Sequence, residues 1–235
     1  MVFICGDTHG QIDIEKLTGE LWPEGKGLTK EDYLIVVGDF GMIWYEPGTE
    51  HEIFLRRFYG DKPWTTLFID GNHENFDRLF SDEFQEIDMF GDKVKRISDS
   101  IFYLQRGRVY KIDGKTFFTF GGGESIDKNT RTPYLSWWPQ EMPTYAEMDL
   151  GISNLEKINN EVDIIVTHTC PNDAFLHLAR TYDLGYKTDA ERSLRTFLSW
   201  VEKNVKFKEW HFGHFHCTLK FGKYYAHYDS KPIMI

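Results

Sequence analysis

The sequence predicts an α/β protein in which two mixed β-sheets pack face to face with helices outside. Short β-rich runs alternate with polar, helix-like segments along the whole chain. The segments 101–104, 108–112 and 115–120 have the composition of strands, and Asp113-Gly114 favours a tight hairpin between the last two. Because no repeat or Ser/Pro-rich linker interrupts the pattern, we expect residues 1–235 to form one domain.

Further apolar runs predict the strands that end at polar motifs. They cover residues 2–5, 33–37, 66–69 and 162–167, and each is followed by a turn that contains Gly or Asp. In open α/β sheets, ligands bind outside the carboxyl ends of the strands, so the motifs are expected to meet there. A turn at 221–223 predicts an antiparallel edge near the C-terminus.

Helix starts are predicted where a threonine precedes a glutamate by three residues, the pattern of a capping box. This pattern occurs at Thr49/Glu52, Thr144/Glu147 and Thr188/Glu191. After the third start, apolar residues recur at helical spacing, which predicts a helix packed on a sheet. They are Leu194, Phe197, Leu198 and Val201.

Composition excludes several classes of protein. The formal net charge of −10 argues against an extended nucleic-acid partner, although a cationic cleft could still attract a small phosphorylated molecule. No apolar stretch approaches the roughly 20 residues of a membrane helix, so no membrane association is expected. The N-terminus lacks the pattern of a signal peptide, and three cysteines without C-x-x-C spacing fit a reducing compartment. We therefore predict a cytoplasmic location.

Candidate metal ligands cluster in five short motifs, GDTHG, GDFG, GNHE, THTCP and FGHFH. They supply carboxylate, amide and imidazole groups but no thiolate, a mixture that suits hard or borderline divalent metals. The candidate ligands are Asp7, His9, Asp39, Asn72, His168, His214 and His216. This set predicts a pair of metal ions and a hydrolase of phosphate esters.

Spacing within the motifs supports this interpretation. Asp7 and His9 are two positions apart, so in an extended strand end both point to the same side, and the same holds for the pair in FGHFH. Asp39 follows a strand and could bridge two ions about 3.5–4 Å apart. His73 is beside Asn72 and diverges from it, which leaves its ring available for proton transfer.

The five motifs in this order resemble those of the calcineurin-like metallophosphoesterase family over nearly the whole chain. The resemblance implies a sandwich of two mixed sheets flanked by helices. It also implies one metal held by Asp7, His9, Asp39 and His216, and a second held by Asp39, Asn72, His168 and His214. Members that act on phosphoproteins carry a further Asp and Arg after GD, where this chain has Met42 and Ile43. That departure argues against a Ser/Thr protein phosphatase.

The expected reaction is hydrolysis of a phosphate monoester or diester by a hydroxide that two ions of Mn, Fe or Zn activate. His73 and Asp39 are the predicted catalytic residues, and the predicted substrate-binding residues are Asn72, His73, Arg131 and Trp138. Arg131 could fork onto a phosphate, and Trp138 could stack on a base. Both lie in an aromatic and basic segment at 121–143 that we expect over the site, although such a loop often serves only packing.

Two alternatives remain open at this point. One is a nuclease or a hydrolase of dinucleoside polyphosphates, and the other is a non-catalytic scaffold with the same fold. The expected partner is a small phosphorylated substrate such as a nucleotide. The sequence makes no prediction of oligomeric state.

Overall fold

The computed structural model describes residues 1–182, 184 and 191–235. Its strands form two sheets. The first contains β1 (Val2–Cys5), β2 (Tyr33–Val36), β3 (Thr65–Phe68), β4 (Gln85–Met89), β5 (Asp92–Ser98), β6 (Ile101–Leu104) and β13 (Ile233–Met234). The second contains β7 (Arg108–Ile112), β8 (Lys115–Phe120), β9 (Ile164–Thr167), β10 (Glu209–Phe212), β11 (Leu219–Phe221) and β12 (Tyr224–Ala226).

Both sheets are mixed, as predicted. The first has the order β13-β1-β2-β3-β6-β5-β4, with parallel pairing from β1 to β6 and antiparallel pairing toward both edges. The second has the order β11-β12-β10-β9-β8-β7, with a parallel centre and antiparallel edges. The predicted hairpin at Asp113-Gly114 joins β7 to β8, and both of its residues have positive φ, as a type I′ turn requires.

The central strands are buried on both faces. In β1, Val2 and Ile4 belong to the core between the sheets, whereas Phe3 and Cys5 belong to the core under the outer helices. Such strands read as continuous apolar runs because each face packs against another layer. The rigid carboxyl ends of these strands therefore support whatever residues follow them.

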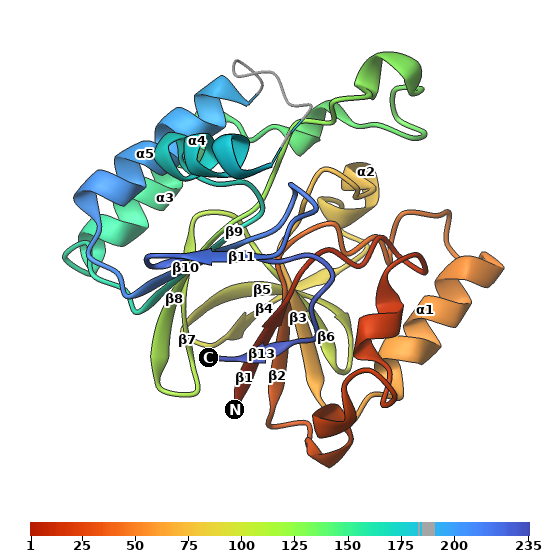
Figure 1. Cartoon of the computed structure of the whole chain (residues 1–235). Helices are drawn as coiled ribbons and strands as arrows, with labels where there is room; N and C mark the ends of the chain where they lie inside the picture. Colours follow the sequence, from red (N-terminus) through yellow and green to blue (C-terminus); the bar gives the residue numbers. More distant parts are fainter. Residues whose placement is uncertain (183, 185–190) are drawn as a thin grey trace.

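Helices cover the outer faces of the two sheets (Figure 1). On the first sheet lie α1 (Glu50–Gly60) and the short α2 (Phe76–Leu79), through Leu55, Tyr59 and Leu79. On the second lie α3 (Tyr145–Lys157), α4 (Asn172–Thr181) and α5 (Arg192–Asn204). Short 3-10 turns are η1 (Ile14–Leu17), η2 (Pro23–Gly27), η3 (Lys128–Thr130) and η4 (Pro139–Glu141). No helix in the described part of the chain is long and apolar enough to span a bilayer.

The predicted helix starts have different outcomes. Thr144 and Glu147 form a complete capping box at α3. Thr49 caps α1, but the Glu52 carboxylate accepts from the Gly48 N–H group instead of completing the box. Thr188 lies outside the described residues, and Glu191 has a left-handed conformation without a side-chain cap on α5. The apolar stripe of α5 is buried as predicted.

Candidate metal centre

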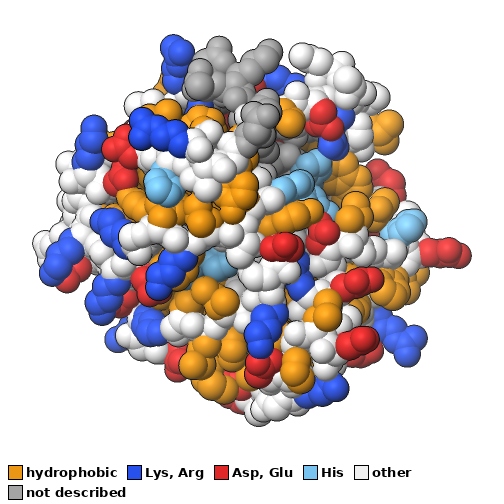
Figure 2. Space-filling model, viewed as in Figure 1, with side chains coloured by type: hydrophobic (Ala, Val, Ile, Leu, Met, Phe, Trp, Pro, Cys, Tyr) orange, Lys and Arg blue, Asp and Glu red, His pale blue; other side chains and the backbone are white. Residues whose placement is uncertain are grey.

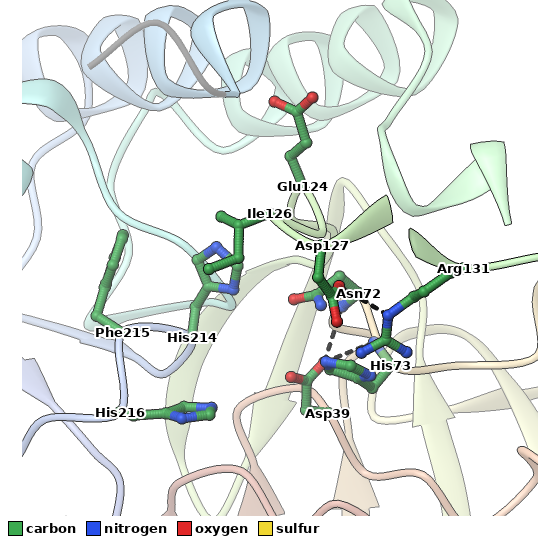
Figure 3. Close-up of a pocket in the computed structure, with 10 residues that line it drawn as sticks. All are labelled: Asp39, Asn72, His73, Glu124, Ile126, Asp127, Arg131, His214, Phe215 and His216. Atoms are coloured by element: carbon green, nitrogen blue, oxygen red, sulfur yellow. Dashed lines mark hydrogen bonds and ion pairs between the residues drawn. The ribbon is translucent and has the colours of Figure 1, made fainter. Parts of the chain in front are cut away.

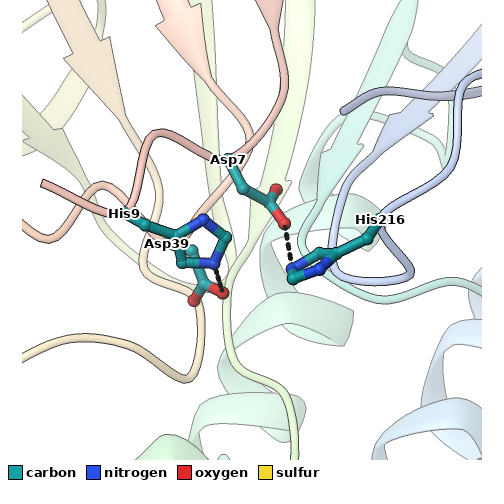
Figure 4. Close-up of side chains that lie close together, drawn as sticks. All are labelled: Asp7, His9, Asp39 and His216. Atoms are coloured by element: carbon teal, nitrogen blue, oxygen red, sulfur yellow. Dashed lines mark hydrogen bonds and ion pairs between the residues drawn. The ribbon is translucent and has the colours of Figure 1, made fainter. Parts of the chain in front are cut away.

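Four of the predicted ligands meet at the ends of β1, β2 and β10. Ligand atoms of Asp7, His9, Asp39 and His216 all lie within 4.8 Å of one another (Figure 4). His9 Nε2 is 3.1 Å from Asp39 Oδ2, and His216 Nε2 is 3.8 Å from Asp7 Oδ2. Both carboxylates are buried, whereas the His216 ring is half exposed. We call these four residues the first ligand group.

Two of the other predicted ligands, Asn72 and His168, lie at the second carboxylate oxygen of Asp39, and His214 lies beside His168. His168 Nε2 is 3.2 Å from Asn72 Oδ1 and 3.3 Å from Asp39 Oδ1. The rings of His168 and His214 have centroids 4.8 Å apart. Asp39, Asn72, His168 and His214 form the second ligand group, and Asp39 contacts rings of both groups.

The Asp39 carboxylate is fixed by the backbone of the neighbouring strand end. Its Oδ1 accepts hydrogen bonds of 2.8 Å from the N–H groups of Asn72 and His73. Burial would raise the pKa of Asp39, but the adjacent His168 and His73 and the hydrogen bonds from His168 and His9 hold it well below its usual value. Asp39 is therefore an ionised carboxylate in a fixed orientation.

Glycines in the motifs make room for these carboxylates. A Cβ atom at Gly71 would lie 2.1 Å from Asp39 Oδ1, and one at Gly213 would lie 2.0 Å from Asp7 Oδ1. Real Cβ atoms do not approach oxygen so closely, so a larger residue would displace either carboxylate. The glycine before Asn72 and the glycine before His214 thus have a steric function.

Four predicted ligands have backbone conformations that L-residues rarely adopt. The φ angles are 44° at His9, 49° at Asp39, 70° at His214 and 48° at His216. A left-handed residue other than glycine costs roughly 1–2 kcal/mol. Backbone strain of this kind concentrates at functional sites, where the surrounding structure holds it in place.

The family comparison agrees with this geometry. A family model described as calcineurin-like phosphoesterase matches residues 1–227. The chain belongs to the calcineurin-like phosphoesterase family. A search of curated proteins finds no match to the chain. Family membership supports metal-dependent hydrolysis of phosphate esters as the general activity and agrees with the two-sheet architecture.

The donor set at these strand ends fits divalent metals. Carboxylate, amide and imidazole ligands suit Mn, Fe or Zn, and the four converging donors of the first ligand group match what one ion needs. Burial lowers the pKa of both His9 and His168, but the nearby Asp39 carboxylate has the larger opposite effect. The pKa of His9 is raised to about 9 and that of His168 to about 10. Because a ligating imidazole must be neutral, metal uptake has to displace these protons, so the affinity for metal should rise with pH.

Three of the candidate histidine ligands are oriented by contacts with other residues. His9 Nδ1 is 2.6 Å from Asp13 Oδ2, and His168 Nδ1 is 2.8 Å from the Val37 carbonyl oxygen. His214 Nε2 is 2.7 Å from Glu191 Oε1. Partners of this kind fix the ring and its tautomer in metal sites. Asp13 and Glu191 were not among the predicted site residues.

Glu191 is the clearest omission, because the sequence pattern assigned it to a helix cap. Its buried carboxylate also accepts from the Glu124 N–H group and the Thr169 hydroxyl, at 2.8 and 2.7 Å. Burial would raise the pKa of Glu191, but His214 and these hydrogen bonds lower it to about 2. The residue belongs to the surroundings of the second ligand group.

The Asn72 amide is also oriented from outside. Its Nδ2 donates to Ser125 Oγ at 3.2 Å, and Ser125 Oγ donates to Glu141 Oε2 at 2.6 Å. Because the amide nitrogen is engaged, Asn72 Oδ1 faces His168 Nε2. Ser125 lies in the conspicuous GGGES segment. Its partner Asn72 is 53 residues away in the chain, so the sequence does not reveal this hydrogen bond.

A pocket of about 330 Å³ opens beside the two ligand groups (Figure 3). Asp39, Asn72, His73 and Arg131 are among the residues that line it. Arg131 Nε donates to Asp127 Oδ1 at 2.7 Å, which fixes the guanidinium at the wall. Figure 2 shows histidine side chains gathered in a recess of this face, beside hydrophobic ones. His73 and Arg131 are thus placed where a substrate could reach them.

Trp138 is located differently from the other predicted substrate-binding residues. Its side chain is buried, its Nε1 donates to Asp77 Oδ2 at 3.0 Å, and its ring packs edge-on against Trp44. It is not among the residues that line the pocket beside the ligand groups. In this arrangement Trp138 supports Trp44 and offers no open face for stacking.

Substitution of Gly71 by alanine tests the steric function of that glycine. The added methyl group should push the Asp39 carboxylate out of place, so we expect Gly71→Ala to bind less metal than the wild type by elemental analysis. Gly60→Ala is the matched control, since a Cβ atom there meets nothing within 4 Å. Circular dichroism checks that each variant is folded.

Asp39→Asn extends the test without adding volume. It removes the charge that both ligand groups share and should also lower metal content. Wild-type metal content in folded Gly71→Ala and Asp39→Asn proteins would contradict the assignment of Asp39 as a ligand.

Proposed function

We propose that this protein hydrolyses small phosphate monoesters or diesters at a centre of two divalent metal ions. The first ligand group would hold one ion and the second ligand group the other. The observation that carries the proposal is the position of Asp39, whose Oδ2 lies 3.1 Å from the His9 ring and whose Oδ1 lies 3.3 Å from the His168 ring. One carboxylate in contact with both groups is what a bridged pair of ions needs.

Bound ions of Mn, Fe or Zn would polarise the phosphate and lower the pKa of a water molecule to near neutrality. The protein residues supply position and charge. Arg131, held by Asp127 at the pocket wall, could bind a phosphate oxygen through its guanidinium. Asn72, held by Ser125, would present its amide oxygen to the second ion.

His73 is the proposed group that assists departure of the leaving oxygen. Its backbone N–H group donates a hydrogen bond to Asp39 Oδ1, and its ring lines the pocket. Burial lowers the pKa of His73, and nearby His9 and Arg131 lower it further against the opposing effect of Asp39. A phosphate anion in the pocket would favour the protonated ring, so the proton would be acquired together with the substrate.

The proposed substrate is a small molecule, and a nucleotide fits this description. The net charge of −10 argues against a long nucleic acid, although a dinucleoside polyphosphate would still be small enough to consider. A non-catalytic scaffold would not need the complete set of seven predicted ligands that this chain retains.

A panel of esters tests the proposal. Protein stripped with a chelator and reloaded separately with Mn²⁺, Zn²⁺ or Fe²⁺ is offered monoesters, diesters, cyclic nucleotides and dinucleoside polyphosphates. We expect turnover of at least one class that requires metal and falls to background in Asp39→Asn, which controls for contaminating phosphatases. Metal binding without turnover of any ester would support the scaffold instead.

Substitution of His73 tests its role as proton donor. His73→Asn should slow hydrolysis of alkyl esters by roughly 10²–10⁴-fold, because their leaving oxygen needs a proton. Nitrophenyl esters, whose leaving group is a stable anion, should lose far less. We measure kcat for both ester types in wild type and in His73→Asn. The control is His177→Asn, which changes an exposed histidine on α4. Equal losses on both esters would refute the role.

A further inference from the structure

The pocket beside the ligand groups adjoins a second recess of about 260 Å³. His73 and Arg131 line both, so the two recesses meet at these side chains. We name the second recess the aromatic lobe, since Trp44 and Tyr45, together with Ile12, are among the residues that line it. His9 of the first ligand group also lines it. A group bound in the aromatic lobe would therefore lie next to the proposed phosphate position.

The two recesses differ in chemistry. The pocket beside the ligand groups is lined by carboxylates and imidazoles, including Glu124 and Asp127. Among the described residues that line the aromatic lobe there is no carboxylate. Beyond His9, His73 and Arg131, the side chains that line it are the uncharged Ile12, Trp44 and Tyr45. An uncharged part of a substrate would be favoured against these three side chains, while the phosphate remains near the metal ligands.

The rings of the aromatic lobe pack against other aromatic side chains. Tyr45 stacks on His51 at 4.7 Å with an interplanar angle of 19°, and about a third of Tyr45 remains exposed. Trp44 packs edge-on against the buried Trp138 at 5.1 Å. A platform supported in this way loses little conformational freedom when a ligand stacks on it.

The backbone of this platform is also fixed. Asn75 Nδ2 donates to the Trp44 carbonyl oxygen at 3.3 Å, and Arg78 Nη1 donates to the carbonyl oxygen of Tyr45. Asn75 and Arg78 belong to the N-cap and body of α2, which directly follows Asn72 and His73 in the chain. The positions of Trp44 and Tyr45 are therefore tied to the same segment that contributes to the candidate centre.

We propose that the aromatic lobe binds a planar aromatic group of the ester, a nucleobase or an aryl ring, by stacking on Tyr45 and Trp44. This inference rests on the proposed function and names its substrate class. Trp44 and Tyr45 directly follow Met42 and Ile43, the two positions at which the phosphoprotein pattern has its Asp and Arg. They take over the stacking role that the sequence suggested for Trp138.

Kinetics with matched esters test the inference. Within whichever ester class the panel identifies, nucleoside, phenyl and methyl esters are compared in wild type and in Tyr45→Ala. Loss of stacking worth about 1–3 kcal/mol should lower kcat/KM for the nucleoside or phenyl ester roughly 5–150-fold. The methyl ester should change less than twofold. A loss confined to the nucleoside ester identifies a nucleobase, and a loss on both aromatic esters identifies aryl rings in general.

Two further variants separate stacking from general damage to the fold. Tyr45→Phe keeps the ring and should retain wild-type kcat/KM. Tyr145→Ala removes an exposed aromatic ring of α3 that lines neither recess and should leave every ester unaffected. An equal loss on methyl and aromatic esters in Tyr45→Ala, or no loss on either, would overturn the inference.

A binding measurement keeps this inference distinct from the proposed function. Adenosine and phenol carry no phosphate, so their binding does not depend on hydrolysis. We expect at least one of them to quench tryptophan fluorescence saturably in wild type, with less quenching in Trp44→Phe and weaker binding in Tyr45→Ala. If the wild type hydrolyses no ester but shows this quenching, the proposed function fails and the aromatic site stands. Saturable quenching by neither compound would overturn the aromatic site.

Discussion

The candidate centre depends on one carboxylate that the backbone holds between two strand ends. Asp39 follows β2. Its Oδ1 accepts hydrogen bonds from the backbone N–H groups of Asn72 and His73, in the segment that follows β3. Gly71 permits this approach because a side chain there would overlap the carboxylate. Since β2 and β3 are parallel neighbours buried on both faces, the sandwich fixes where Asp39 sits before any ion binds. The remaining candidate ligands are arranged around that fixed point.

Rigidity around Asp39 allows strained conformations to persist. Candidate ligands with positive φ would relax in a flexible loop, but here neighbouring elements restrain them. Of the residues with positive φ, His9 is held by Asp13, and His214 lies against Glu191. The Val37 carbonyl oxygen orients His168 in the same way. In His9 and His168 the contact is made by Nδ1, while Nε2 faces Asp39, so orientation and ring chemistry are determined together. The segment around Ser125 adds the same control over Asn72.

Much of this organisation could be predicted from the sequence because it is local. Strands β1, β6, β7 and β8 were predicted with their observed bounds, and the seven candidate ligands follow or adjoin buried strands. Contacts between distant segments could not be predicted. Glu191 matched a helix-capping pattern, yet its carboxylate lies against His214, and burial of Trp138 depends on Asp77 and Trp44 from another part of the chain. Spacing within a motif does not encode such partners.

The shared position of Asp39 is tested most directly by a crystal structure of the protein loaded with Mn²⁺, with anomalous scattering used to locate the ions. The account predicts two peaks, one among Asp7, His9 and His216 and the other among Asn72, His168 and His214, with Asp39 coordinating both. A single ion, or two ions of which either lacks Asp39 as a ligand, would contradict it.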